Sequence, residues 1–239
     1  MHVFLDIGFT LIGGPEIGPS AWLARELGLP SAAKAELKSW LFTTDLSAPE
    51  ILADRLSEVY RLDRAHTRRV VGGFWDRQIQ DAYPLPGAER FLTELERANL
   101  PYAFITNIWT PFLMGFARCF PQAFERVPLF ASCRLGLAKP DAALYQKALE
   151  GTGVRPEQAV MIGDTYEMDL APALRLGMKG VWLLHRPAKE TTDLVAVLNQ
   201  RAPCPDLTLS GIDVLTPEHL SGLFPATNPA NPANPVEKP

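Results

Sequence analysis

Short apolar runs alternate with helix-like segments through most of the chain after residue 80, and this alternation limits the possible folds more than any other feature. The runs are short enough to be buried strands, and they occupy residues 102–105, 129–133, 159–163 and 180–184. Segments with helical patterning separate them, for example at residues 141–153 and 169–177. Strands that alternate with helices form a parallel sheet covered on both faces. The sequence therefore predicts an α/β fold with a Rossmann-like parallel sheet.

A further apolar run, at residues 2–5, ends on a lone carboxylate, Asp6, with Gly8 two residues later. Open α/β sheets bind their ligands at the carboxyl ends of the strands. Asp6 is therefore a candidate functional residue if this run is a strand of the same sheet. The alternative is that Asp6 only caps the next segment, and this stretch alone does not decide between the two.

Residues 14–81 interrupt the alternation. After Leu11 a Gly- and Pro-rich connector turns the chain away from the sheet. Four segments then show apolar residues three and four positions apart, and they occupy residues 20–29, 31–44, 48–62 and 63–80. Four consecutive helices without strands predict a small helical insert.

These patterns divide the chain into three parts. We expect residues 1–13 and 82–224 to form the α/β core domain, and residues 14–81 to form a small all-helical cap domain. Residues 225–239 repeat Asn-Pro-Ala and contain almost nothing to bury, so we expect them to be a disordered tail.

The composition excludes several kinds of partner. The chain has 239 residues, with 23 Lys and Arg against 27 Asp and Glu, so it has no basic excess for nucleic acid or an anionic membrane. No apolar run approaches the roughly 18 residues of a membrane span. The three cysteines are scattered without a paired spacing, which favours a reducing compartment. We therefore expect a cytoplasmic protein that binds neither nucleic acid nor a membrane, and the sequence leaves its oligomeric state open.

Polar side chains stand at or near the ends of the other predicted strands. They are Thr106, Asn107, Lys139, Asp164 and Asp169, and in a parallel sheet we expect them near Asp6 at one edge. Two or three carboxylates beside one lysine repel one another unless a further cation joins them. Oxygen ligands without His or Cys favour Mg²⁺ over zinc or copper.

Each of these residues also has a simpler interpretation. Acidic groups favour helix N-termini, so Asp164 and Asp169 could merely start a helix. Thr106 could be an ordinary hydroxyl at a strand end, and Lys139 could be a solvated surface lysine.

The motifs, in their order along the chain, resemble those of the haloacid dehalogenase-like (HAD) hydrolase superfamily. The first motif of that family is Asp-x-Asp-x-Thr after a strand, which corresponds here to Asp6, Gly8 and Thr10. The second is a Ser or Thr that ends a strand, and the third is a Lys. The fourth is Gly-Asp followed by a second Asp. The matching residues are Thr106, Lys139, Gly163, Asp164 and Asp169.

The predicted helical insert lies between the first and second motifs, where this family places its cap. The resemblance covers residues 1–224 and implies the HAD fold. It implies a Mg²⁺-dependent phosphatase that acts on a small phosphorylated metabolite.

The resemblance also implies roles for the residues. Asp6 would be the catalytic nucleophile and would form an aspartyl-phosphate. Thr106 and Lys139 would complete the catalytic set and bind the phosphate. Mg²⁺ would be held by Asp6, the backbone carbonyl of Gly8, Asp164 and Asp169.

Other residues near the motifs carry weaker expectations. Thr10 would make a hydrogen bond that holds the nucleophile loop. Asn107 and Trp109 follow Thr106 and could line the substrate side of the site, although structural roles fit them equally well.

Gly8 departs from the family pattern. Phosphatases of this family carry a second Asp at that position, which protonates the leaving alcohol and later activates water. Glycine cannot transfer a proton, and general acid–base help is typically worth about 10²–10⁴ in rate. A backbone carbonyl can still bind a metal, so only the proton-transfer role is missing at Gly8.

Three functions therefore stay open. The first is a Mg²⁺-dependent phosphatase that is slow or depends on good leaving groups. The second is a 2-haloacid dehalogenase, which needs no leaving-group acid, but the acidic fourth motif with Asp164 and Asp169 argues against it. The third is a binding or regulatory protein that keeps the pocket without turnover, and the missing acid at Gly8 supports this alternative.

Overall fold

The computed structural model describes residues 1–224. Six parallel strands form one sheet in the order β5-β4-β1-β6-β7-β8. The strands are β1 (His2–Leu5), β4 (Tyr102–Thr106), β5 (Leu129–Ala131), β6 (Ala159–Gly163), β7 (Lys179–Leu183) and β8 (Leu207–Leu209). The predicted α/β fold with a parallel sheet is confirmed. Strand β8 was not predicted, because its three residues are only half buried or exposed and carry little apolar signal.

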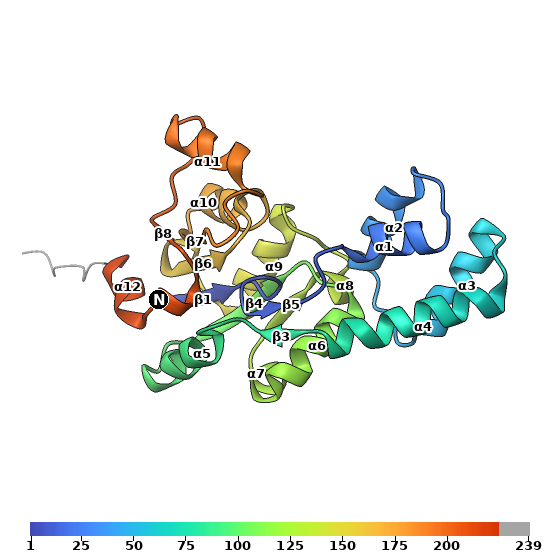
Figure 1. Cartoon of the computed structure of the whole chain (residues 1–239). Coiled ribbons are helices and arrows are strands. Elements are labelled where there is room, and N and C mark those ends of the chain that lie inside the picture. Colours follow the sequence, from blue (N-terminus) through green and yellow to red (C-terminus); the bar gives the residue numbers. More distant parts are fainter. Residues whose placement is uncertain (225–239) are drawn as a thin grey trace, which may run out of the picture.

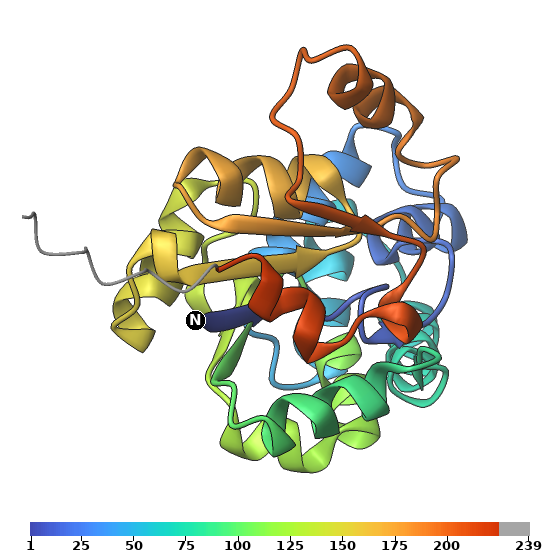
Figure 2. The ribbon, with the colours of Figure 1, turned by 90° about the vertical axis from the view of Figure 1, so that its left-hand side faces the viewer.

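Helices cover both faces of the sheet (Figures 1 and 2). On one face lie α5 (Ala88–Arg97), α6 (Thr110–Cys119), α7 (Pro121–Arg126) and α12 (Pro217–Gly222). On the other lie α9 (Ala142–Thr152) and α10 (Ala171–Arg175). Two further helices, α8 (Ser132–Leu135) and α11 (Thr191–Leu198), follow β5 and β7.

The side chains of β1 alternate between these two layers. Val3 and Leu5 pack in the hydrophobic cluster that contains Phe91 of α5, whereas Phe4 packs with Tyr145 of α9. A strand buried on both faces has a continuous apolar sequence, which is why β1 and β6 were recognisable as short apolar runs. Phe4 pairs with Ala103 on one side and Met161 on the other, so β1 lies in the middle of the sheet.

The chain leaves the sheet after the short strand β2 (Ile12–Gly13) and returns through β3 (Tyr83–Pro84), with which β2 pairs in antiparallel fashion. Between them lie four helices, which we call the helical insert. They are α1 (Pro19–Glu26), α2 (Ala33–Thr43), α3 (Pro49–Tyr60) and α4 (Arg64–Gln80). The insert extends to one side of the sheet (Figure 1). The division into two domains stays a prediction.

The helical insert has a hydrophobic cluster of its own. Leu23, Leu41, Leu56 and Phe74 are buried in it, and Trp109 joins it from the loop after β4. The ring of Trp109 lies 5.5 Å from that of Phe74, between centroids. Trp109 therefore connects the insert to the sheet, at the carboxyl edge of β4.

Within residues 1–224, every helix is too short or too polar to cross a membrane. The disordered tail predicted for residues 225–239 lies outside the described residues.

Candidate active site

Asp6 and Lys139 meet at the carboxyl edge of the sheet. Asp6 directly follows β1, and its backbone N–H donates to the carbonyl of Ile162 at 2.9 Å. The Nζ of Lys139 donates to Asp6 Oδ1 at 2.6 Å, to Asp169 Oδ1 at 2.5 Å and to the carbonyl of Ile105 at 3.1 Å. All three charged side chains are buried: the exposed fraction of the side chain is 2% for Lys139, 8% for Asp6 and 2% for Asp169.

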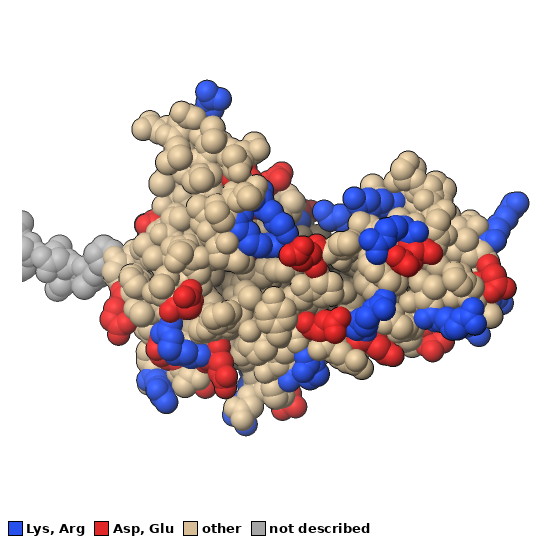
Figure 3. All heavy atoms as spheres, viewed as in Figure 1, with Lys and Arg blue, Asp and Glu red and all other residues tan. Residues whose placement is uncertain are grey.

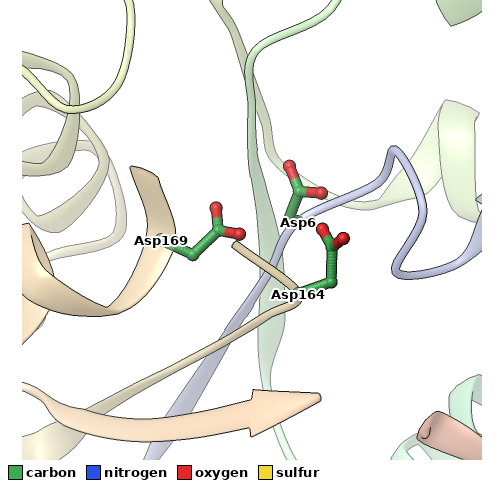
Figure 4. A group of neighbouring side chains, drawn as sticks. All are labelled: Asp6, Asp164 and Asp169. Carbon is green, nitrogen blue, oxygen red and sulfur yellow. The ribbon is translucent and has the colours of Figure 1, made fainter. Parts of the chain in front are cut away.

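Asp164 brings a third carboxylate to this edge. It follows β6, and Asp6, Asp164 and Asp169 each have a carboxylate oxygen within 4.8 Å of the others. Figure 4 shows the three side chains pointing toward one another. Arg186, in the loop after β7, pairs with Asp164 Oδ2. Three carboxylates therefore share two cationic partners, Lys139 and Arg186.

A single π-helical turn, η2 (Tyr166–Leu170), carries Asp169 back toward Asp164. The backbone N–H of Thr165 donates to Asp169 Oδ2 at 2.9 Å, and the indole N–H of Trp182 donates to the carbonyl of Asp164 at 3.2 Å. These bonds hold both carboxylates in place from the backbone side. Irregular turns of this kind are frequent at functional sites.

The pKa values show that the cluster is short of positive charge. Burial, with the charges of Asp169 and Asp6, raises the pKa of Asp164 well above its usual range despite Arg186. Burial likewise raises the pKa of Asp169 to about 6, although Lys139 opposes the shift. For Lys139 burial acts to lower the pKa, but the combined effect of Asp169 and Asp6 raises it. A further cation would relieve this repulsion, and three oxygen donors suit a hard ion such as Mg²⁺.

The loop after Asp6 is held by its backbone. The N–H groups of Leu11 and Ile12 donate to the carbonyl of Ile7 at 2.9 and 3.1 Å. The prediction that Thr10 makes a hydrogen bond to hold this loop is wrong, because its buried Oγ1 has no partner within residues 1–224. The backbone bonds to Ile7 already close the turn, so the loop does not require the hydroxyl.

Gly8 has room for a side chain. A Cβ added there would lie 3.7 Å from Cε1 of Phe112, which is an ordinary van der Waals contact. The left-handed backbone conformation in this loop belongs to Phe9, with φ 57°, and not to Gly8. The glycine is therefore not required by the backbone of the loop.

Asn107 and Thr106 lie beside Lys139 in different ways. The Asn107 side chain makes two hydrogen bonds to the backbone of Lys139, of 2.8 and 2.7 Å, and so holds that residue. Asn107 also lines the cavity described below, whereas Thr106 does not. Thr106 is fully buried at the end of β4, and its Oγ1 is without a hydrogen-bond partner in the described chain.

A cavity of about 350 Å³ opens above the acidic cluster. Its walls come from both parts of the molecule, the sheet edge and the helical insert. The sheet side contributes Asp6, Gly8, Asn107, Lys139, Asp164, Asp169 and Arg186, and the insert contributes Lys38, Phe42 and Gln78. Figure 3 shows the surface hollowed where the insert meets the sheet region, with Lys and Arg side chains on both sides of the hollow.

Sequence reasoning missed several residues of this cavity. Arg186 follows β7 and could have been found by the same strand-end rule that identified Asp164. Gln78 and Lys38 lie on helices whose pattern indicates only which face is buried, so no local signal distinguishes them.

Comparison with known proteins matches this chain to hydrolases, both through a family model and through individual relatives. A family model described as haloacid dehalogenase-like hydrolase matches residues 21–177. The chain is 37% identical over 109 residues to phosphoserine phosphatase of Thermus thermophilus, covering 42% of this chain and 41% of that protein. It is 33% identical over 103 residues to glyceraldehyde 3-phosphate phosphatase of Pyrococcus furiosus, covering 41% of each. The matched region thus spans about two fifths of the length of these curated relatives.

Solved structures resemble the chain over nearly its whole length. A hydrolase from Pseudomonas syringae has a TM-score of 0.59 at 17% identity, covering 92% of this chain and 97% of that one. A 2-haloacid dehalogenase from Pseudomonas syringae pv. Tomato has a TM-score of 0.60 at 22% identity, covering 92% and 98%. CbbY from Rhodobacter sphaeroides, in complex with phosphate, has a TM-score of 0.55 at 19% identity, covering 90% and 95%. At these identities the likeness concerns the fold.

Proposed function

Because this chain belongs to the haloacid dehalogenase-like hydrolases, we propose that it is a Mg²⁺-dependent phosphatase that acts on a small phosphorylated metabolite through Asp6. The family predicted from the motifs is confirmed by the family model and by the curated relatives. The observation that carries the proposed activity is the buried contact of Lys139 with Asp6 and Asp169 at the floor of a cavity.

In the proposed reaction, the Asp6 carboxylate attacks phosphorus and the bond from phosphorus to the alcohol oxygen breaks. This forms an aspartyl-phosphate, and water then attacks its phosphorus to release inorganic phosphate and restore Asp6. Lys139 donates a hydrogen bond to Oδ1 of Asp6. Oδ2 of Asp6 receives no hydrogen bond from residues 1–224 and is available to attack phosphorus. The hydroxyl of Thr106 has no partner within residues 1–224 but does not line the cavity, so its role as a donor to a phosphate oxygen stays a prediction.

The acidic cluster fits a divalent cation because its carboxylates outnumber its cations and two of them have raised pKa values. Asp6, Asp164, Asp169 and the carbonyl of Gly8 would hold the ion. When bound there, Mg²⁺ would offset the repulsion between the Asp6 carboxylate and an anionic phosphate.

Because position 8 is a glycine, no side chain there can protonate the alcohol that departs from phosphorus. The proton must then come from water, the substrate or another side chain, and esters of acidic alcohols should react faster than alkyl esters. The same glycine favours the second candidate, a binding or regulatory protein that retains the pocket without turnover.

A panel of phosphate esters with Mg²⁺, together with 2-chloropropionate, tests the proposal. We expect phosphate release to exceed chloride release, to stop with EDTA and to be lost in Asp6→Asn. Asp76→Asn, a change of an exposed carboxylate on α4, should keep the activity. Chloride release that EDTA does not affect would favour dehalogenation, and ester binding without release of either ion would favour the binding protein.

A further inference from the structure

Gln78 is a buried polar side chain on α4 that lines the cavity from the helical insert, and only 3% of it is exposed. The indole N–H of Trp109 donates to its Oε1 at 3.1 Å. Because an indole nitrogen can only donate, the amide oxygen must face Trp109. The orientation of the amide is therefore set by its partner, and its NH₂ group points elsewhere.

That NH₂ group is unpartnered. Nε2 of Gln78 is buried and makes no hydrogen bond to any residue from 1 to 224. Almost all buried polar groups in native proteins have a hydrogen-bond partner, and an unsatisfied buried donor costs about 1–3 kcal/mol. An unpaired amide beside a cavity indicates that the partner comes from a ligand.

The side chain of Gln78 is held in a fixed position by its packed partner, Trp109. Trp109, which holds the amide oxygen, is 1% exposed, and its ring packs edge-on against Trp75, with 5.8 Å between ring centroids. Gln78 and Trp109 together join the helical insert to the loop after β4. Turning the amide over would place two donors against each other, so the ligand is the simpler source of an acceptor.

The surroundings assign Gln78 to the alcohol part of a substrate. Asp6 and Lys139 form the sheet end of the cavity, where the proposed function places the phosphate. Gln78 belongs to the insert, and the aromatic rings of Phe42, Trp109 and Phe112 line the same cavity. These rings suit a carbon skeleton, and they supply no acceptor for the amide.

We propose that Gln78 donates a hydrogen bond from Nε2 to an acceptor oxygen on the alcohol part of the substrate. The site then selects phosphate esters whose alcohol carries a carboxylate or an ether or carbonyl oxygen over esters of plain hydrocarbon alcohols. This selection rests on the proposed phosphatase function and adds the chemical class of the substrate. A site built to pair a polar group discriminates strongly against an analogue that leaves its own donor unpaired.

Matched pairs of compounds test the selection. One pair is 2-methoxyethyl phosphate and butyl phosphate, which differ by an ether oxygen in place of a methylene. The other is 2-phosphoglycolate and isobutyl phosphate, in which a carboxylate replaces a branched alkyl group of similar shape. KM is compared where hydrolysis is detectable, and Kd from isothermal titration with Mg²⁺ where it is not. We expect the protein to prefer the oxygen-bearing member of at least one pair by about tenfold or more.

Two variants remove the donor in different ways. Gln78→Met removes the whole amide, and Gln78→Glu keeps an acceptor for Trp109 but replaces the donor by a second acceptor. Gln78→Met should bring the preference to within about twofold of one in both pairs. Gln78→Glu should abolish the preference for the ether and reverse that for 2-phosphoglycolate, because two carboxylates repel each other. Gln80→Met changes an exposed glutamine on the same helix and should keep the full preference.

No preference in the unchanged protein would overturn the inference, as would a preference that survives in a folded Gln78 variant. The two proposals fail separately. Binding that depends on Gln78 but is not followed by phosphate release would contradict the phosphatase proposal and support the role of Gln78. Phosphate release from both members of each pair at equal KM would support the phosphatase proposal and contradict the role of Gln78.

Discussion

Lys139 lies between Asp6 and Asp169, and Asn107 holds its backbone through two hydrogen bonds. A lysine in this position neutralises part of the charge of the cluster without occupying all of its oxygens. Asp164 relies instead on Arg186, whose guanidinium also lies 4.0 Å from the centre of the Phe9 ring. Lys139 therefore pairs with Asp6 and Asp169, whereas Asp164 pairs with Arg186 and not with Lys139.

Asp164→Asn should weaken Mg²⁺ binding by roughly tenfold or more, because it removes one charged ligand from a set of three. The loss of Mg²⁺-dependent turnover should accompany it while the fold survives. Isothermal titration with Mg²⁺ measures the change, and Asp76→Asn provides a control at an exposed carboxylate. An unchanged Mg²⁺ affinity in Asp164→Asn would remove this residue from the metal site.

Gly8→Asp should restore a proton donor to the leaving group. A side chain fits there, since the added Cβ meets only Phe112 at 3.7 Å and the backbone is not left-handed. Hydrolysis of alkyl phosphates should rise by up to about 10²–10⁴-fold, and that of aryl phosphates much less, because aryl oxides leave with little protonation. Steady-state kinetics on matched alkyl and aryl esters measures the difference.

Gly8→Asn is the matched control for this change, because it has nearly the same shape and no acidic proton. Both variants should still bind Mg²⁺ through the backbone of the loop. A folded Gly8→Asp that binds Mg²⁺ but gains nothing on alkyl esters would show that the missing acid does not limit this protein. The binding-protein interpretation would then be favoured.

Strand β1 carries Asp6 to the centre of the sheet edge because it pairs with both β4 and β6. Its residues Val3, Phe4 and Leu5 are fully buried, so the position of the carboxylate depends on packing on both faces. The buried start of the strand is a histidine, His2, whose Nε2 finds no hydrogen-bond partner in the described part of the chain. Burial, with the charge of the N-terminus, lowers the pKa of His2.

The lowered pKa of His2 makes β1 sensitive to acid. Below the ordinary pKa of 6.5 the unfolded chain binds a proton that the folded protein does not, so His2 lowers the free energy of unfolding as the pH falls from 6.5 through the folded pKa. The loss of stability between pH 7.5 and 5.5 should therefore be smaller in His2→Gln than in the unchanged protein. Urea unfolding at the two pH values measures it.

The raised pKa values of Asp164 and Asp169 act in the opposite direction, since the folded protein takes up protons there first. Both proteins contain these residues, so their effect cancels in the comparison. An equal pH dependence in the two proteins would show that His2 titrates normally in the folded state.

The whole molecule places the cavity between two hydrophobic clusters, that of the sheet and that of the helical insert, with Trp109 and Gln78 at the junction. Asp6, Asp164 and Asp169 line the cavity on the sheet side. A cation bound there interacts only with the folded chain, because Asp6 is far from Asp164 and Asp169 in the sequence. Metal binding is therefore coupled to global stability.

Mg²⁺ at about 100 times its Kd should stabilise the folded protein by about 2.7 kcal/mol, which corresponds to a rise of roughly 5–10 °C in Tm for a domain of this size. Thermal unfolding with MgCl₂ and with EDTA measures the shift, and NaCl at equal ionic strength controls for screening. The same shift in Asp164→Asn as in the unchanged protein would contradict a site at this cluster.

The parallel α/β core was predictable from the sequence alone, because buried strands and amphipathic helices carry their own apolar periodicity. The sequence also identified Asp6, Lys139, Asp164 and Asp169 as neighbours, since the carboxyl ends of parallel strands share one edge of a sheet. The expected hydrogen bond of Thr10 failed because backbone bonds to Ile7 close the loop without it.

The residues of the helical insert that line the cavity above the acidic cluster could be identified only in the folded molecule. Gln78 and Trp109 are 31 residues apart in the sequence, and their hydrogen bond exists because two hydrophobic clusters meet at that point. The pairing of Arg186 with Asp164 likewise depends on the path of the loop after β7. Periodicity records which face of an element is buried but not what that face meets, so contacts between distant elements required the packed molecule.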